Sequence, residues 1–160
     1  MENSGLKNLI GADVAVFTLL LDSVGLFFDE SRRLRISNLN SFWRLTQNGQ
    51  IKYTSNDFYV RSEYSFDISF APLGDELLDE IMFGEDDEEV VRERIFEKLA
   101  EAVDETVDAM KEILEGAILE NFEESSGGDL KLYFSKGITL EVFSAPCGKK
   151  ACRPPYELMI

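Results

Sequence analysis

The charge of this chain is distributed very unevenly along the sequence, and this constrains its fold more than any other feature. Between Asp75 and Glu124 there are 20 acidic and four basic residues, a net charge of −16. The other 110 residues carry 11 acidic and 12 basic side chains, a net charge of +1. We therefore expect a near-neutral body and one acidic module, which repels phosphates and anionic lipids and speeds encounters with basic proteins.

Apolar residues recur with helical spacing inside the acidic segment, after a capping pair formed by Asp86 and Glu89. This pattern predicts one long amphipathic helix over about 86–121, which Gly116 either bends or ends. A short helix over about 75–83, stopped by a glycine, is predicted before it. The apolar side of the long helix includes Val91, Ile95, Leu99, Val103, Val107 and Met110.

Seven carboxylates of the predicted helix follow one another at intervals of three or four residues, which places them on one face, opposite the apolar side. Like charges at this spacing cost a few tenths of a kcal/mol each, so a surface optimised for stability would intersperse lysines. At 1.5 Å per residue the row is about 33 Å long, enough to line a protein interface. We call these residues the acidic stripe: Glu93, Glu97, Glu101, Asp104, Asp108, Glu112 and Glu115.

The two ends of the chain alternate apolar and polar residues, as strands with one buried face do. The segments 42–45 and 51–53 flank Asn48-Gly49, a strong hairpin signal. Further strands are predicted at 14–21, 24–28, 34–36, 64–70, 130–134 and 138–143, with a final edge strand at 156–160. The predicted fold is α+β, a single domain over 1–160. A mostly antiparallel sheet from residues 1–72 and 129–160 packs against the long helix, and the acidic helical segment spans 75–122.

Aromatic and basic residues near strands have two readings. Trp43 is expected to fill the core while Arg44 faces water, although an aromatic beside an arginine also suits an interface. Arg32, Arg33 and Arg35 form either a solvated turn or a second, basic contact site.

The composition excludes many enzyme mechanisms. The chain has no histidine, which removes Ser-His-Asp, Cys-His and HExxH mechanisms, and it contains no Walker A or GxGxxG sequence. The acidic run 85–89 lacks the spacing and glycine of a calcium loop. Cys147 and Cys152 either close a small disulfide loop or remain two thiols, and they are too few for a zinc site. We therefore expect no catalytic residues, metal or cofactor.

The sequence shows neither the long apolar stretch of a membrane span nor the start of a secretory signal. No stretch approaches 18 to 20 uninterrupted apolar residues, and the segment from Met1 to Gly5 lacks the basic start of a secretory signal. The expected location is the cytoplasm.

A family resemblance is carried by Phe42-Trp-Arg-Leu45, by 128–134 with 140–143, and by Tyr156-Glu157. These phrases resemble small bacterial domains of unassigned function, some of which are suspected immunity proteins that neutralise toxins from competing cells. The resemblance covers about a third of the chain and consists mostly of hairpin patterns. It implies a non-catalytic inhibitor.

Charge and resemblance together predict a non-catalytic binding protein that neutralises a basic toxin or nuclease through the acidic stripe. A cationic groove would accept the carboxylates in place of phosphates, with no direct binding of nucleic acid or membrane. Three alternatives stay open. In the first, the stripe is only a solvated face. In the second, the chain is a module that forms a homodimer through Val91, Ile95 and Leu99. In the third, the chain is an enzyme that uses carboxylates and a metal.

Overall fold

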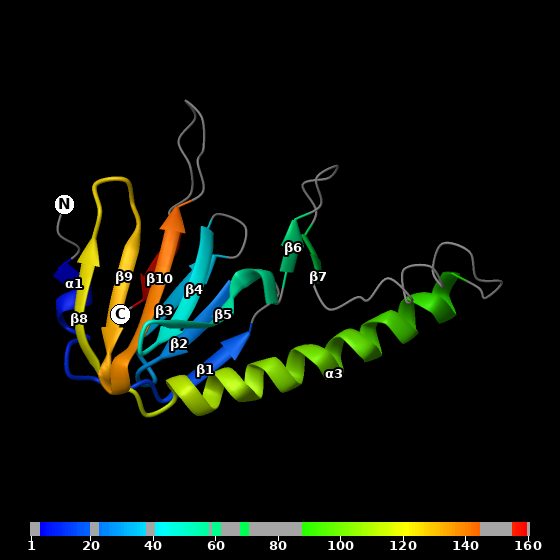
Figure 1. Ribbon diagram of the computed structural model, residues 1–160, viewed down its shortest axis with the longest axis horizontal. Coiled ribbons are helices and arrows are strands. Elements are labelled where there is room, and N and C mark those ends of the chain that lie inside the picture. The colour runs from blue at the N-terminus through cyan, green and yellow to red at the C-terminus, as the bar shows by residue number, and fades with distance from the viewer. Residues whose placement is uncertain are drawn as a thin grey trace. The chain divides into compact units, whose positions relative to one another are not determined.

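The computed structural model describes residues 4–19, 23–37, 41–57, 59–61, 68–70, 88–144 and 155–159. The chain divides into two compact units, residues 1–55 with 109–160 and residues 56–108, which we describe one at a time (Figure 1). We call the first the two-sheet unit. The second, with 18 acidic and four basic residues, we call the acidic unit. The prediction of a single domain over 1–160 stays a prediction.

The first sheet of the two-sheet unit has four antiparallel strands in the order β1-β2-β3-β11. Side chains of β3 alternate between exposed or half-buried and fully buried positions, so one face of the sheet is buried. The segment predicted as an edge strand at 156–160 does lie at an edge. The strands are β1 (Val16–Leu19), β2 (Ser23–Phe27), β3 (Arg33–Ser37) and β11 (Tyr156–Met159).

The second sheet has five antiparallel strands in the order β5-β4-β10-β9-β8. It joins an early hairpin of the chain to a late one through the pairing of β4 with β10. The mixed α+β class with mostly antiparallel sheets is thus as predicted, although the described strands form two large sheets and a separate two-stranded pair in place of one sheet. The strands are β5 (Gln50–Thr54), β4 (Ser41–Gln47), β10 (Ile138–Ser144), β9 (Leu130–Phe134) and β8 (Leu119–Glu124).

Two turns at one end of the five-stranded sheet lie against each other. Asn48 and Gly49 have φ values of 51° and 79°, the left-handed pair of a two-residue hairpin, which confirms the predicted turn. Gly137, with φ 69°, ends the short 3-10 turn η2 (Ser135–Gly137). The Asn48 N–H donates to the Gly137 carbonyl at 2.9 Å, and a Cβ on Gly137 would lie 2.2 Å from Asn48 Oδ1. A larger residue at 137 would therefore need a strained φ and a movement of the Asn48 side chain, so the position favours glycine.

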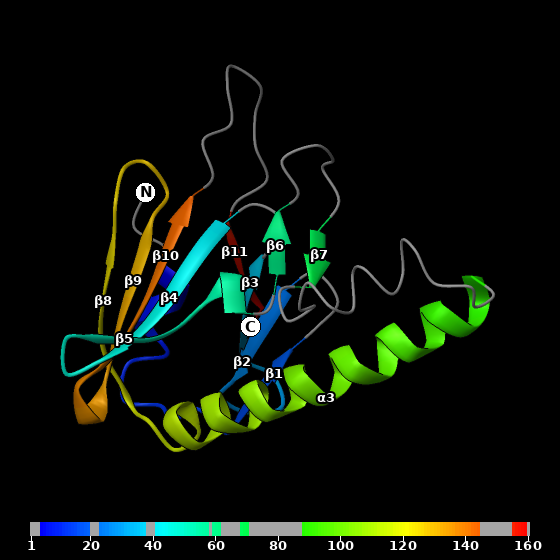
Figure 2. The same ribbon diagram turned by 45° about the vertical axis from the view of Figure 1, so that its right-hand side comes forward.

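The core of the two-sheet unit lies between its two layers of strands (Figures 1 and 2). Both layers turn alternate apolar side chains inward, and Trp43 of β4, at 0% exposure, is the largest fully buried side chain. This confirms the predicted core position of Trp43. The short helix α1 (Ser4–Lys7) is followed by a turn and adds Leu6 and Leu9 to the buried set.

The helix α3 (Glu88–Leu114) is shorter than the predicted 86–121, and the prediction was wrong for its carboxyl end. Gly116 adopts φ 83°, the left-handed conformation that commonly ends a helix. Its N–H donates to the carbonyl of Val14, and the chain then enters β8. The glycine therefore ends the helix instead of bending it. The last turns bury Met110 and Leu114 in the two-sheet unit.

The acidic unit begins within the 3-10 turn η1 (Ser55–Asp57). It contains the first part of α3 and an antiparallel pair of strands, β6 (Tyr59–Arg61) and β7 (Ile68–Phe70). Only 68–70 of the strand predicted at 64–70 is described. The helix predicted at 75–83 lies outside the described residues. In the described part of the chain, no helix is long and apolar enough to cross a membrane.

Candidate functional site

Five residues of the acidic stripe have described side chains on α3, and all five are exposed to solvent. No ion pair joins them to any residue that the structure describes. The side chain of Glu93 lies outside the described set. The five exposed carboxylates are those of Glu97, Glu101, Asp104, Asp108 and Glu112.

Glu115, the last predicted member of the stripe, has a different role. It follows the end of α3 and is half-buried. Its Oε1 accepts a hydrogen bond of 3.1 Å from the backbone N–H of Phe17, whose side chain is buried. Because this carboxylate ties β1 to the end of the helix, we assign Glu115 to the structure of the two-sheet unit and leave it out of the candidate surface.

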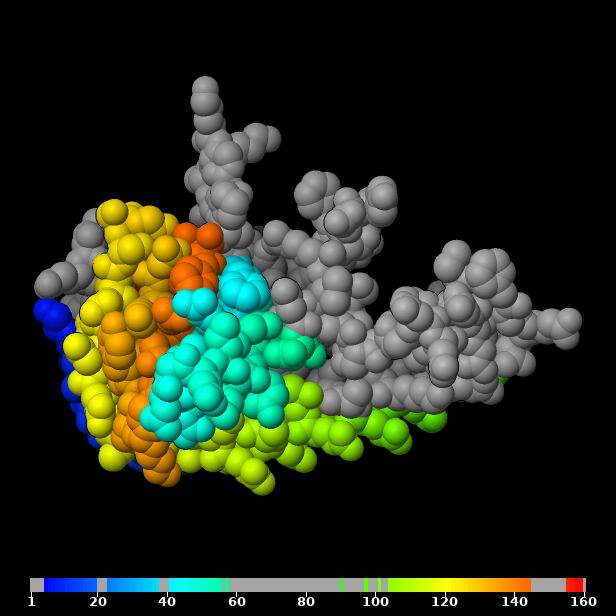
Figure 3. Space-filling model, viewed as in Figure 1, coloured from blue at the N-terminus to red at the C-terminus, as the bar shows by residue number. Residues whose placement is uncertain are grey.

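A second surface, which sequence reasoning missed, is the outer face of the five-stranded sheet. Alternate side chains of its central strands point away from the core, and they are half-buried or exposed. Figure 3 shows strands of this sheet at the surface that faces the viewer. We call this surface the open face, with Phe42 and Arg44 of β4, Lys131 and Tyr133 of β9, and Glu141 and Phe143 of β10.

Glu141 lies at the centre of the open face and pairs with two cations from the neighbouring strands. The Arg44 guanidinium donates to one carboxylate oxygen, and the Lys131 ammonium lies 3.3 Å from the other. Hydrogen bonding to Arg44 holds the pKa of Glu141 below its usual value, and Glu141 in turn raises the pKa values of Arg44 and Lys131. The Glu141 side chain is 14% exposed, whereas both cations are more than a third exposed.

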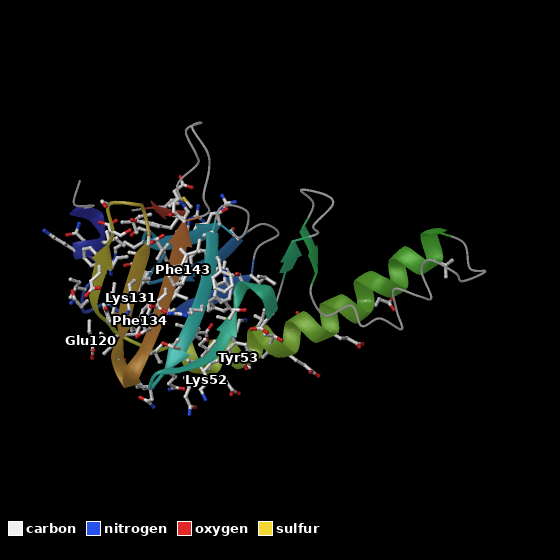
Figure 4. The ribbon with its side chains drawn as sticks, turned by 45° about the horizontal axis from the view of Figure 1, so that its top comes forward. Lys52, Tyr53, Glu120, Lys131, Phe134 and Phe143 are labelled. Atoms are coloured by element: carbon white, nitrogen blue, oxygen red, sulfur yellow. The ribbon has the colours of Figure 1, made fainter. Side chains whose placement is uncertain are left out.

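Aromatic rings flank these charges on the same face, on which Figure 4 labels Phe143 and Lys131. Phe42 and Phe143 stack with centroids 6.1 Å apart, and Phe42 is 38% exposed. The Arg44 guanidinium lies 5.3 Å from the Phe143 centroid, and the Lys131 ammonium lies 5.3 Å from that of Tyr133. Exposed aromatic rings next to arginine are typical of protein interfaces.

Two hollows adjoin β8. The smaller, about 220 Å³, is lined by Phe143 and Lys131 together with Glu123, Ser125 and Asp129. The larger, about 610 Å³, is lined by residues of α1 and its turn and of β8 and the loop after it, including Lys7, Ile10, Asn121 and Phe122. Among the described residues, no group of three or more acidic, cysteine or histidine side chains is placed to hold a metal. The side chains of the run 85–89 and of both cysteines fall outside the described set.

The three arginines near residue 33 divide between a turn and a strand. Arg32 belongs to the turn, where its Nε lies 2.6 Å from Asp29 Oδ2; hydrogen bonds from Arg32 lower the pKa of Asp29 to about 2. Arg33 and Arg35 point outward from β3. The Arg33 guanidinium lies 5.8 Å from the Phe27 centroid, and Arg35 Nε donates to Ser23 Oγ at 2.8 Å.

The residues of the open face can be recognised in the sequence, but the pattern of a single strand does not show that they lie together. Charged and aromatic residues occupy the non-core positions of 42–44, 131–133 and 141–143. Their grouping depends on the pairing of Arg44 with Glu141, which are 97 positions apart, and alternation alone does not fix such a long-range register.

No protein-family model, curated protein or solved structure matches this chain.

Proposed function

We propose that the protein is a non-catalytic binding protein, of the immunity type, that neutralises a basic toxin or nuclease in the cytoplasm through the acidic stripe. The observation that carries the proposal is the exposure of four successive stripe carboxylates within the acidic unit. They belong to Glu97, Glu101, Asp104 and Asp108, and they cover about 17 Å of helix at 1.5 Å per residue.

Electrostatics supports a partner for these carboxylates. Neighbouring like charges on a helix are unfavourable by a few tenths of a kcal/mol per pair, so the stripe is not the arrangement that best stabilises the helix by itself. The acidic unit has a net charge of −14. A field of this sign accelerates association with a basic surface and keeps nucleic acid away. Inhibition then requires only that the stripe cover a cationic groove.

The proposal also includes the predicted packing of the apolar side of α3. Burial of Met110 and Leu114 supports it for the last turns. The alternative in which Val91, Ile95 and Leu99 mediate a homodimer concerns side chains outside the described set, and no observation favours it. The metal-dependent enzyme has no observation in its favour either.

The test compares the native protein with a variant in which the four stripe carboxylates become amides, Glu97→Gln, Glu101→Gln, Asp104→Asn and Asp108→Asn. Both are used as bait in extracts of the source organism and of its competitors. A matched control removes four exposed carboxylates of the two-sheet unit, at Asp13, Glu30, Glu120 and Glu157.

We expect the native and control baits to capture one basic protein that the stripe variant does not capture, with capture weakening as salt rises. The purified partner should then lose its activity when the native protein is added. If the stripe variant captures and inhibits the partner as well as the native protein does, the stripe is only a solvated surface and the proposal fails.

A further inference from the structure

We propose that the open face of the five-stranded sheet binds a second copy of this chain, forming a weak two-fold symmetric dimer. The inference rests on the order of charges across the sheet and on the position of the exposed aromatic rings beside a hollow. It is independent of the four stripe carboxylates on which the proposed function rests, because those belong to the acidic unit.

The charges form one row across four adjacent strands. Glu123 of β8 pairs in register with Lys131 of β9, Lys131 with Glu141 of β10, and Glu141 with Arg44 of β4. Arg44, Lys131 and Glu141 belong to the outer face, because they alternate with buried neighbours on the central strands. Glu123 is exposed on the edge strand β8, and as the register partner of Lys131 it lies on the same face. The row therefore reads negative, positive, negative, positive at neighbouring strand positions.

A row of this kind is complementary to itself under one particular symmetry. A two-fold axis in the plane of the interface, parallel to the strands and between β9 and β10, reverses the order of the row in the second copy. Glu123 then faces Arg44 of the second copy, and Lys131 faces Glu141. Each charge meets one opposite charge, and each kind of contact occurs twice, as in an isologous interface.

The same symmetry places the aromatic rings over the smaller hollow. Phe42 and Phe143 lie two residues beyond the charge row, on β4 and β10. The axis carries them to the corresponding level of β8 and β9 in the second copy, which is the level of Ser125 and Asp129. Those two residues line the hollow of about 220 Å³. The exposed ring of Phe42 thus has a recess opposite it.

Charge and size together point to a copy of the chain and to a weak complex. The row has no net charge, so it offers long-range attraction to neither acidic nor basic proteins, whereas a second copy supplies the matching order. The axis brings four strands of each copy opposite one another, β4, β10, β9 and β8. Four strands about 4.8 Å apart and about 20 Å long give each copy a footprint of roughly 400 Å², half that of a standard interface. Each copy carries a net charge of −15, so low salt should oppose association.

The test is sedimentation equilibrium of the full chain at moderate salt, at concentrations up to several hundred micromolar. We expect a monomer–dimer equilibrium that Arg44→Glu and Glu123→Arg each weaken at least tenfold, because each creates two like-charge contacts across the axis. The double variant Arg44→Glu/Glu123→Arg should recover most of the affinity. The two single changes shift net charge in opposite directions, so general repulsion cannot weaken both.

Arg33→Glu is the matched control, since Arg33 also lies on a strand over a phenylalanine ring but belongs to the other sheet. It should leave the equilibrium within about twofold of the native value. Circular dichroism confirms that each variant is folded. A native protein that stays monomeric over the whole concentration range overturns the proposal, and so does a folded double variant that recovers no affinity.

Discussion

The two units of this chain handle charge in opposite ways. The two-sheet unit carries 13 acidic and 12 basic residues, and several of them are paired across strands or turns, as with Glu141 and Arg44 or Asp29 and Arg32. In the acidic unit, the described carboxylates of the stripe have no ion pair with a described residue. Charge in the first unit is thus largely neutralised by neighbouring side chains, whereas the exposed carboxylates of the second are available to act at a distance.

The largest effect should come from removing the side chain at the centre of the core. Trp43→Ala is expected to lower the free energy of unfolding by about 3–5 kcal/mol, because the cavity it leaves cannot fully close. Chemical denaturation measures this. Val90→Ala, on the exposed side of α3 at 48% exposure, is the control and should change it by less than about 0.5 kcal/mol. Similar losses for both variants would contradict the division between a packed unit and a charged one.

A smaller loss is expected where the two turns of the five-stranded sheet touch. Gly137→Ala combines a left-handed φ with a clash against Asn48, so it should cost about 2–3 kcal/mol. Gly11→Ala shares the left-handed φ but meets nothing within 4 Å, and about 1 kcal/mol is expected. Thermal unfolding of both variants isolates the contact. Equal losses would mean that backbone conformation alone matters.

The paired charges of the open face should contribute less still. Glu141→Gln is expected to cost less than about 1 kcal/mol at neutral pH, since Arg44 and Lys131 remain partly solvated. The pKa of Glu141 is lowered in the folded state, so its contribution is present above the ordinary glutamate pKa of about 4.3 and is lost as pH falls through the lowered value.

Urea titrations of native protein and variant between pH 7 and pH 2 check this dependence. Their difference in stability should shrink toward zero as the pH decreases. A difference that persists unchanged at the acid end would show that Glu141 acts through shape and not through charge.

The smallest expected effect is a difference between the two units in how salt changes amide hydrogen exchange. Screening relieves repulsion among stripe carboxylates, so helix amides at 97–108 should exchange their hydrogens about twofold to threefold more slowly at high salt. Strand amides at 130–134 should change little. Hydrogen exchange followed by mass spectrometry reports both segments in one experiment, and faster helix exchange at high salt would refute the repulsion argument.

Local rules predicted most of the strands of the two-sheet unit. Alternation located β3, β9 and β10, and Asn48-Gly49 located the β4–β5 hairpin, because these signals act within a few residues. The predicted end of α3 was wrong because acidic and apolar residues continue with helical spacing past Gly116. The helix ends at this glycine because of tertiary hydrogen bonds, such as that from the Gly116 N–H to the Val14 carbonyl. The exposure of the stripe was expected from spacing, whereas the structural bond of Glu115 and the charge row of the open face depend on contacts about 100 positions apart.

The pairing of β4 with β10 also imposes a delay during biosynthesis, because the two strands are made far apart in time. Arg44 leaves the ribosome 97 residues before its partner Glu141, a delay of about 5–20 s at usual translation rates. During that interval the acidic segment is being made, and the edge of β4 that later pairs with β10 has no partner strand. A nascent chain in this state would be a template for strand pairing between chains. Repulsion between the acidic segments of neighbouring nascent chains opposes such encounters until β10 completes the sheet.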